Sequence, residues 1–556
     1  MAIHDLRNLD LGSPLDADVC IVGSGPAGWA LAEELSTTGL TVLVLESGGL
    51  LESGERDRDP PCDALNDTDD VGVPLFNGRR RTLGGTPEAI FWGNRCIAFD
   101  PIDYEERPWI ARSGWPIGPA DVAPFLDRAS RHMGGGPYLP DGPVLPRAAV
   151  PPRVDPAQLR NVWWWFGRAA DKGSVRYARL FRQRPHPNVR VLVHATVTHL
   201  NTNDTGSRIE SVEVADPEGR RARVTARSVV LCAGGIENAR LLLYSNRVRP
   251  AGLGNDHDLV GRFLMDHPRD LEMAITFDPR DGDRIQRLFG YHRYDGGDGP
   301  RLFAGGLALS DELQRREGLV NCAAWPVAES ADDDPIWAAQ RAALRLLRRG
   351  DGDLRRNLGH VARQPLRLLR AAHAHLIADQ PMRHKYGKVG LLIGSEQVPD
   401  PDSRVTLGDR TDRYGLPLVR TDWRIGQREK DSQVALGRII AREFQRLSLP
   451  TPHVAEWVRS GRVDDAVFSD GCHPTGTTRM ARDPSAGVVD ADGQVHGVDG
   501  LFVAGSSVFP TAGHANPTLM ILALSVRLAA HLAARLGGRP GGSPPSTEPH
   551  VRPITA

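Results

Sequence analysis

The chain has 556 residues, and its 68 Lys and Arg nearly balance its 69 Asp and Glu. That length suffices for two or more packed layers around a large core. The balanced charge argues against a nucleic-acid-binding protein, whose binding face would make the chain strongly basic. The six cysteines form no C-x-x-C pair, and the N-terminal residues lack the basic start and apolar run of a secretory signal. These features predict a cytoplasmic protein with reduced thiols, and the lack of about 18 consecutive apolar residues predicts no transmembrane segment.

The first elements form a strand–helix–strand unit. The apolar run 18–22 predicts a buried strand, and 26–36 has the spacing of an amphipathic helix that ends at Gly39. The β-branched run 41–45 predicts a second strand. This order of elements at the start of a domain is typical of an α/β fold.

A glycine fingerprint lies between the first strand and the helix. Gly23, Gly25 and Gly28 match G-x-G-x-x-G in the context that the motif requires. Gly23 allows the turn, Gly25 lets the backbone approach a pyrophosphate, and Gly28 lets the helix pack on the strand. Glu46, which ends the second strand, would accept hydrogen bonds from ribose hydroxyls. The unit therefore favours a dinucleotide site, and an ordinary glycine-rich turn is the alternative. These residues do not distinguish NAD from FAD.

The middle of the chain alternates loops and strands. We expect a loop over 50–80, a small antiparallel sheet from 186–200, 207–216 and 221–225, and a strand at 228–232 followed by a helix through Leu243. Strands are predicted within 388–424, with a turn at 413–416.

The C-terminal elements are a strand and a helix. The run 501–504 predicts a strand that ends in small residues, and 518–536 predicts the last helix. A late strand that returns to a second helix N-terminus suits a flavin site, whereas an NAD domain does not need it. The tail 537–556 has too few apolar residues to pack, so it is predicted to be disordered.

Three further segments carry open interpretations. The basic and apolar stretch 336–376 could be a solvated cover, an oligomer contact, or a site for a membrane surface or anionic partner. The aromatic cluster 163–166 could pack in the core or contact a sugar ring. The acidic run 329–334 could be a solvated loop or attract a cationic substrate.

Linked motifs throughout the chain resemble the glucose–methanol–choline (GMC) oxidoreductase family. The C-terminal block contains H-P-T-G-T-T-R-M at 473–480, L-F-V-A-G-S-S-V-F-P-T at 501–511 and A-N-P-T-L at 515–519. Agreeing motifs are L-G-G-T at 83–86, W-G-N-R at 92–95, C-A-G-G-I-E-N-A-R at 232–240 and G-R-F-L-M-D-H-P at 261–268. The resemblance covers roughly 17–270 and 385–535 and is weakest over 270–385.

The resemblance implies an α/β protein in which a Rossmann-like FAD-binding domain interleaves with an α+β substrate domain. The FAD-binding domain is expected to comprise 1–270, with substrate-domain insertions, and 465–536, and the substrate domain 271–464. By position, the family's cofactor contacts fall on Gly23, Gly25, Gly28, Glu46, Gly84, Gly85, Thr86, Trp92, Val197, Ala233, Ala504, Gly505, Asn516, Pro517 and Thr518.

The same resemblance implies the catalytic pair. The histidine of H-x-x-G-T falls on His473, and its partner before the last helix falls on Asn516. A neutral histidine can take the hydroxyl proton of an alcohol. An asparagine can hydrogen-bond the same oxygen without a charge, while the flavin accepts the hydride at N5. His514 is a second polar candidate that we expect to line the wall. No metal is expected.

One branch of the family attaches FAD covalently through a histidine. The corresponding segment here, 85–92, is longer and contains none. We therefore predict non-covalent FAD, with Phe91 or its neighbours near the dimethylbenzene edge.

The substrate prediction rests on analogy. S-G-W-P at 113–116 and E-Q-V-P-D-P-D-S-R-V-T-L at 396–407 resemble the bacterial branch with pyranose oxidases and sugar or aminoglycoside dehydrogenases. This favours oxidation of a hydroxyl on a sugar, aminocyclitol or related polyol, with O2 or another electron acceptor. A steroid or terpenoid alcohol, a non-redox lyase on the same scaffold, and a NAD-dependent enzyme are the alternatives. The oligomeric state stays open.

Overall fold

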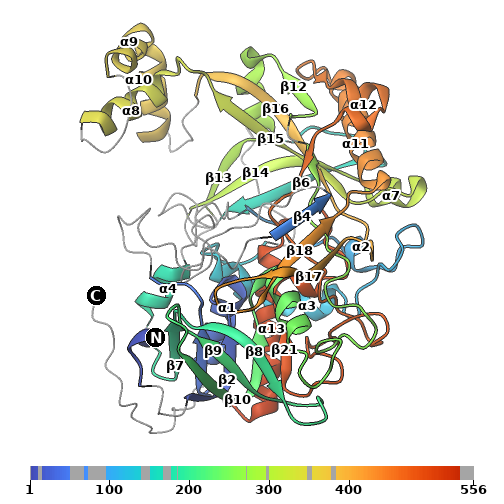
Figure 1. Ribbon diagram of the computed structural model, residues 1–556. Coiled ribbons are helices and arrows are strands. Elements are labelled where there is room, and N and C mark those ends of the chain that lie inside the picture. Colours follow the sequence, from blue (N-terminus) through green and yellow to red (C-terminus); the bar gives the residue numbers. More distant parts are fainter. Residues whose placement is uncertain are drawn as a thin grey trace.

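The computed structural model describes residues 2–10, 15–50, 68–72, 95–139, 151–166, 177–184, 186–270, 272–295, 300–346, 354–376 and 384–538. Two large sheets, one above the other in Figure 1, organise these residues. The predicted disordered tail lies, from Arg539 on, outside the described residues.

An eight-stranded sheet forms the lower part. Its order is β1 (Ala2–Asp5), β7 (Val189–Val193), β3 (Val42–Leu45), β2 (Leu15–Val22), β10 (Arg221–Leu231), β9 (Ile209–Ala215) and β8 (Thr196–Thr202), and β21 (Leu501–Val503) also pairs with β10. The pairs from β1 to β10, and that of β10 with β21, are parallel, whereas β9 pairs antiparallel with both β10 and β8. Strands such as Val42–Leu45 are buried on both faces, as a helix-covered parallel sheet requires.

This arrangement corrects one expectation. The runs 221–225 and 228–232 belong to one long strand, β10, and the antiparallel strands extend the parallel sheet instead of forming a small sheet of their own. Between the two runs, Ala226 is half-buried and Arg227 is exposed, which makes one strand look like two.

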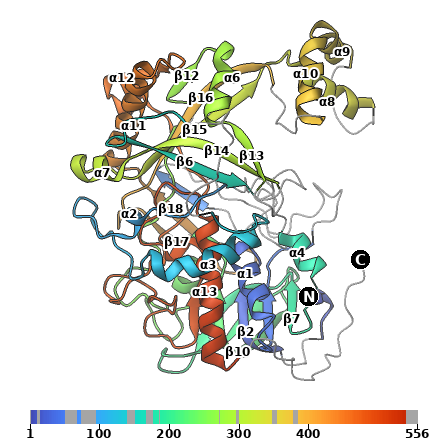
Figure 2. The same cartoon turned by 180° about the vertical axis from the view of Figure 1, so that it is seen from behind.

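Helices cover the eight-stranded sheet. They are α1 (Pro26–Leu35), α5 (Gly234–Tyr244) and α13 (Thr518–Leu536), with α2 (Pro101–Tyr104), α3 (Pro119–His132) and α4 (Tyr177–Gln183) nearby. In Figure 2, α13 stands beside α1 and α3, and it packs against both. By length and composition α13 could cross a membrane, but 61% of its apolar window is buried inside the protein, as in a core helix. In the described part of the chain, short 3-10 helices occur at Leu6–Asn8, Pro279–Asp281, Val463–Asp465 and Ser506–Val508.

The upper sheet has ten strands and its own core. Its main path is β19 (His453–Val454), β12 (Ile275–Phe277), β16 (Tyr386–Ser395), β15 (Cys322–Ser330), β14 (Pro300–Leu309), β6 (Leu159–Phe166) and β5 (Arg95–Cys96), joined by β11 (Arg269–Asp270), β13 (Tyr291–Asp295) and β20 (Phe468–Ser469). The helices are α6 (Gly282–Phe289), α7 (Asp311–Glu317), α11 (Gln427–Arg446) and α12 (Glu456–Ser460). Buried Leu436, Ile440 and Phe444 of α11 join its core.

A three-stranded sheet includes a strand within a predicted loop. Its order is β17 (Arg404–Thr411), β18 (Pro417–Trp423) and β4 (Thr68–Gly72). We expected 50–80 to be a loop throughout, which is wrong for β4. The sequence T-D-D-V-G has little β propensity, and its extended form is explained by parallel pairing with β18, far away in the sequence.

Three helices project from the upper sheet as an arm. They are α8 (Pro335–Leu346), α9 (Leu354–Arg363) and α10 (Pro365–Leu376), inserted between β15 and β16. Figures 1 and 2 both show the arm away from the body. Within 336–376 the described residues are helical except at Gln364, just before Pro365, where α9 has ended and α10 begins.

Candidate active site

The predicted cofactor residues follow neighbouring strands of the lower sheet. Val22 of β2 lies beside Leu45 of β3 on one side and Leu231 of β10 on the other, and Leu231 lies beside Val503 of β21. The loops after these parallel strands therefore meet at one edge. They carry Gly23 and Gly25, Glu46, Ala233, and Ala504 with Gly505. This carboxyl edge is where doubly wound sheets bind ligands.

The backbone at this edge fits an extended dinucleotide such as FAD. A Cβ placed on Gly25 would meet nothing within 4 Å, and the same holds for Gly505. A Cβ on Gly28 would instead lie 2.0 Å from the carbonyl oxygen of Gly23, so Gly28 is needed for the helix to pack on the loop. The N-termini of α1 and α13 present free N–H groups that suit phosphate or flavin oxygens.

The predicted ribose acceptor lies beside the fingerprint. The Glu46 carboxylate accepts hydrogen bonds from Ser24 N at 3.2 Å and Gly48 N at 2.8 Å. Ala195 N donates to the Glu46 carbonyl oxygen at 2.8 Å. Val197 follows Ala195 by two residues in the chain, so it comes shortly after this contact with Glu46. The remaining predicted cofactor contacts, Gly84, Gly85, Thr86 and Trp92, together with Phe91, lie outside the described residues.

The predicted base, His473, is held by a buried carboxylate. Asp266 accepts hydrogen bonds from His473 N and Gly471 N, both at 2.7 Å. Asp266 is itself anchored, because its N–H donates to Gln397 Oε1 at 2.9 Å. A Cβ on Gly471 would lie 2.9 Å from His473 Nδ1, so a larger residue at 471 would displace the His473 ring. Atoms of Asp266, His267 and His473 lie within 4.8 Å of one another, as in a metal site, but both Asp266 oxygens accept backbone N–H groups, so the cluster is a hydrogen-bonded network.

A chain of hydrogen bonds sets the tautomer of His473. His267 Nε2 lies 3.0 Å from the Gly513 carbonyl oxygen, which can only accept, so this nitrogen carries the proton. Neutral His267 then offers the lone pair of its Nδ1, which lies 3.0 Å from His473 Nδ1. His473 Nδ1 must therefore donate. In the neutral ring this leaves Nε2 of His473 unprotonated and able to accept a proton.

The surroundings keep both imidazoles neutral. Burial lowers the pKa of His267 to about 4. Burial is also the main reason why the pKa of His473 lies well below 6.5, and His267, Arg269 and Arg95 lower it further. A neutral imidazole is the form that acts as a general base.

Aromatic and cationic side chains from the upper sheet form one wall of the candidate active site. The Arg95 guanidinium carbon lies 5.2 Å from the Trp325 ring centroid and 5.7 Å from that of Trp164. Trp164 also contacts His514 edge-to-face, with centroids 6.0 Å apart. Of the aromatic cluster 163–166, Trp164 thus belongs to this wall and is buried in a small cluster with Val162 and Phe166, while Trp165 packs in the main core.

His514 lies next to Trp164 of this wall. Its ring is buried, and its Nδ1 lies 3.4 Å from Asp100 Oδ2. The second member of the predicted pair, Asn516, is partly buried at the start of α13, on the loop that accepts the His267 hydrogen bond through Gly513. No hydrogen bond joins Asn516 directly to His473 in the described part of the chain. The structure thus connects His473, through His267 and Gly513, to the loop that carries Asn516.

Comparisons with known proteins agree with this site. Residues 163–269 and 399–525 match two models of the family described as GMC oxidoreductase, and residues 16–51 match an FAD binding domain.

The chain belongs to the GMC oxidoreductase family.

As a GMC oxidoreductase, it is an FAD-dependent enzyme that acts on CH–OH groups. It is 26% identical to paromamine 6'-oxidase of Streptomyces fradiae, over 92% of this chain and 90% of that protein. It is 24% identical to the fructose dehydrogenase large subunit of Gluconobacter japonicus, over 93% and 97% of the two chains. Pyridoxine 4-oxidase from Mesorbium loti shares its fold, with a TM-score of 0.51 at 18% identity, covering 92% of this chain and 98% of that one.

Several site residues of this GMC oxidoreductase were missed from the sequence. Asp266 and His267 lie in G-R-F-L-M-D-H-P at 261–268, and Arg95 ends W-G-N-R at 92–95. The resemblance to the family gave these three residues no role. The adjacent Asp and His were the available signal. Their contact with His473, about two hundred positions later, depends on the fold.

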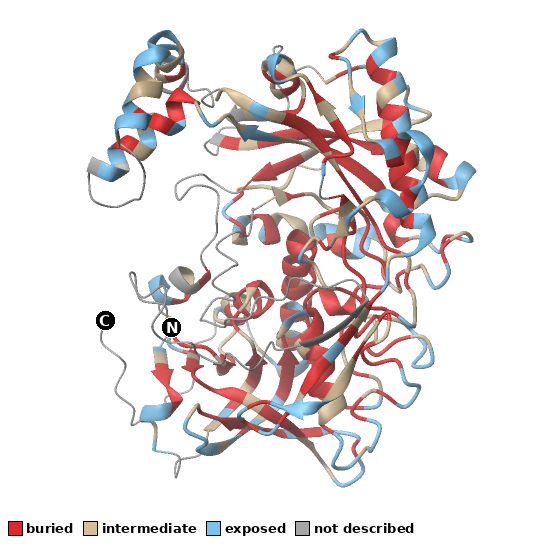
Figure 3. Cartoon of the chain, turned by 45° about the horizontal axis from the view of Figure 1, so that its top comes forward, coloured by how far each residue is buried: buried red, intermediate tan, exposed pale blue. Residues whose placement is uncertain are grey.

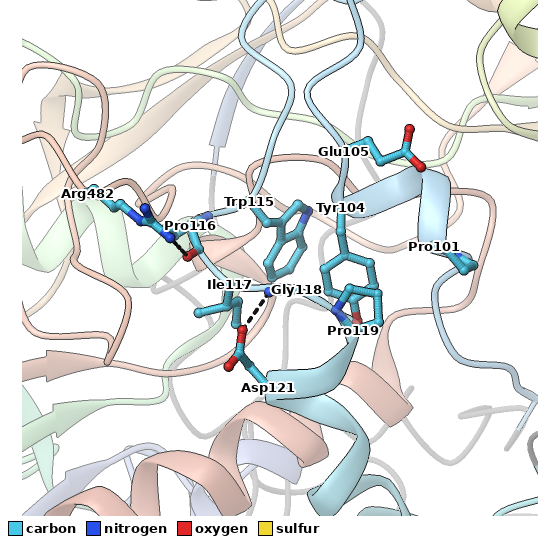
Figure 4. A pocket seen from close by; sticks show the side chains of 10 residues that line it. All are labelled: Pro101, Tyr104, Glu105, Trp115, Pro116, Ile117, Gly118, Pro119, Asp121 and Arg482. Atoms are coloured by element: carbon cyan, nitrogen blue, oxygen red, sulfur yellow. Dashed lines mark hydrogen bonds between the residues drawn. The ribbon is translucent and has the colours of Figure 1, made fainter.

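A pocket of about 380 Å³ lies on another surface. Figure 4 shows Tyr104 and Trp115 on its walls, with Arg482 hydrogen-bonded to the Pro116 carbonyl oxygen. None of the predicted catalytic or cofactor residues that the structure describes lines this pocket.

Proposed function

We propose that this enzyme oxidises a hydroxyl group of a sugar, an aminoglycoside or aminocyclitol, or a related polyol to a carbonyl, with His473 as the base. The observation that carries the role of His473 is the hydrogen-bond chain from Gly513 through His267, which leaves His473 Nε2 unprotonated. The names of the relatives support the substrate class, since they include an aminoglycoside oxidase and a sugar dehydrogenase.

The residues divide the work in a simple way. His473 Nε2 accepts the hydroxyl proton of the substrate, and the Asn516 amide donates a hydrogen bond to the same oxygen. FAD, when bound along the carboxyl edge of the lower sheet, supplies the acceptor for the hydride. Arg95 and Arg269, which already lower the pKa of His473, favour negative charge on the substrate oxygen as the proton leaves.

The test is anaerobic bleaching of the flavin absorbance by a panel of sugars, aminoglycosides, sterols and simple alcohols. We expect one polyol class to bleach the wild-type enzyme. His473→Ala should slow bleaching about a hundredfold or more, the contribution of a general base. His453→Ala is the matched control, because His453 is exposed on the short strand β19.

Three outcomes would contradict the proposal. Bleaching by sterols alone would identify an apolar alcohol as the substrate. No bleaching by any compound, with FAD bound, would favour a lyase. Equal rates for His473→Ala and wild type would remove His473 as the base.

A further inference from the structure

The arm formed by α8, α9 and α10 has no role in the active site, and its surface is unusual. It is joined to the ends of β15 and β16 by a few contacts. Trp337 Nε1 donates to Ser330 Oγ at 2.6 Å, and Arg367 Nη2 donates to the His384 carbonyl oxygen at 3.1 Å. Figure 3 shows α9 and α10 of the arm mainly in the colours of exposed and intermediate residues. The arm is therefore anchored at its base and open to its surroundings elsewhere.

The charge of the arm has one sign. Its three helices contain no aspartate or glutamate and seven arginines, at positions 341, 345, 355, 356, 363, 367 and 370. The whole chain has a formal charge of −1, so the rest of the molecule is net acidic. A solvated cover would not need such segregation, because mixed charges keep a surface soluble.

The arm also exposes large apolar side chains. Among the described residues, seven such side chains are exposed, and four of them belong to the arm. Leu366 is 69% exposed and Leu369 is 65% exposed, both on α10, while Leu358 on α9 is 50% exposed. Exposing neighbouring leucines to water is unfavourable, which suggests that another surface covers them.

The apolar and cationic groups share helix faces. On α10 the exposed positions 366, 369, 370 and 373 recur at helical spacing and carry Leu, Leu, Arg and His. On α9 the exposed Arg355, Leu358 and Ala362 form a similar row. Arginine and leucine side by side suit an interface between phosphate groups and hydrocarbon, since guanidinium binds phosphate oxygens while the leucines leave water.

We propose that this arm docks on an anionic lipid surface. Charge complementarity favours acidic lipid headgroups, and the exposed leucines of α9 and α10 enter the boundary between headgroups and acyl chains. A second copy of the arm is disfavoured as the partner, because two such surfaces would repel each other. The arm does not span the bilayer, since each helix has only ten to twelve residues.

The experiment is co-sedimentation of the FAD-loaded enzyme with vesicles of phosphatidylcholine alone or mixed with phosphatidylglycerol. We expect binding to the mixed vesicles, and weaker binding as salt rises, because surface electrostatics are screened. The pair Arg363→Gln and Arg370→Gln should weaken binding about tenfold or more, since each arginine near an anionic surface contributes roughly fivefold. The pair Leu366→Ser and Leu369→Ser should weaken binding even at low salt.

Matched controls separate this inference from general charge and folding effects. Arg280→Gln removes a cation whose side chain is 90% exposed, and Val467→Ser removes an apolar side chain that is 52% exposed, both outside the three helices of the arm. These controls should bind as wild type does, and all variants should keep wild-type melting temperature and flavin content. Equal binding to phosphatidylcholine alone, or arm variants that bind like wild type, would overturn the proposal. So would lipid-independent dimers that the arm variants abolish.

Discussion

At the scale of single residues, the orientation of one imidazole decides whether the site can take a proton. His267 donates to Gly513, and this leaves its other nitrogen to accept from His473. Removing a side chain that hydrogen-bonds and orients a functional histidine usually changes activity by about one to two orders of magnitude. His267 is therefore a positioning residue that acts through His473.

Replacing His267 tests that role. His267→Leu removes the acceptor for His473 Nδ1, so we expect kcat/KM to fall about a hundredfold. His267→Gln, whose amide can both accept and donate, should recover part of this loss. Steady-state kinetics over a range of pH, with flavin content as the check on folding, provide the measurement. Equal activity of the leucine variant and wild type would exclude the positioning role.

The expected pH dependence of kcat/KM follows from the lowered pKa of His473. Its pKa lies well below 6.5, so the base is neutral at pH 6.5 and above. We expect kcat/KM to stay level as the pH falls to 6.5, and to decline only in more acidic solution, when the ring becomes protonated. Arg269→Gln removes a positive charge that lowers this pKa, so the acidic decline should move to higher pH. Burial raises the pKa of Asp266 to about 7, so a decline centred at or above 6.5 that persists in Asp266→Asn would contradict the assignment.

At the scale of elements, sequence reasoning worked where the local pattern and the fold agree. The unit β2–α1–β3 was predicted from apolar runs and three glycines, and the structure confirms it. The fingerprint could be read because each glycine has a local geometric reason. By contrast, β4 depends on pairing with a distant strand, and the role of His267 depends on contacts with His473 and Gly513, so the local sequence alone predicts neither.

Two glycines of the fingerprint should respond differently to alanine. Gly25 has φ −64° and ψ −169° with open space at its Cβ, so Gly25→Ala should leave the apoprotein stability unchanged but weaken FAD binding. Gly28→Ala would place a Cβ 2.0 Å from a backbone oxygen and should destabilise the fold by about 1–3 kcal/mol. Denaturant unfolding of the apoproteins and flavin titration measure the two effects. Similar unfolding of both variants would contradict this distinction.

At the scale of the whole molecule, the cofactor joins distant parts of the chain. The loops after β2, β3, β10 and β21 meet at one edge, so bound FAD should stabilise the assembled fold. A ligand at a hundredfold excess over its dissociation constant adds about 2.7 kcal/mol. We expect the apoprotein to melt at a lower temperature than the holoenzyme, in a calorimetric comparison at fixed protein concentration.

Acid precipitation tests how the cofactor is attached. With no histidine in 85–92, all the flavin should appear in the supernatant. Yellow colour retained by the washed precipitate would show a covalent bond and contradict the expectation.

The pairing of β10 with both β2 and β21 has a consequence for biosynthesis. Gly28 and Thr518, which flank the cofactor edge, are 490 positions apart in the chain (518 − 28). A ribosome adds about 5–20 residues each second, so roughly 25–100 s separate the two halves of the site. Until β21 is synthesised, the nascent chain contains only part of the cofactor site, and the edge of β10 that pairs with β21 has no partner. Flavin loading can therefore finish only after β21 and the start of α13 have been synthesised.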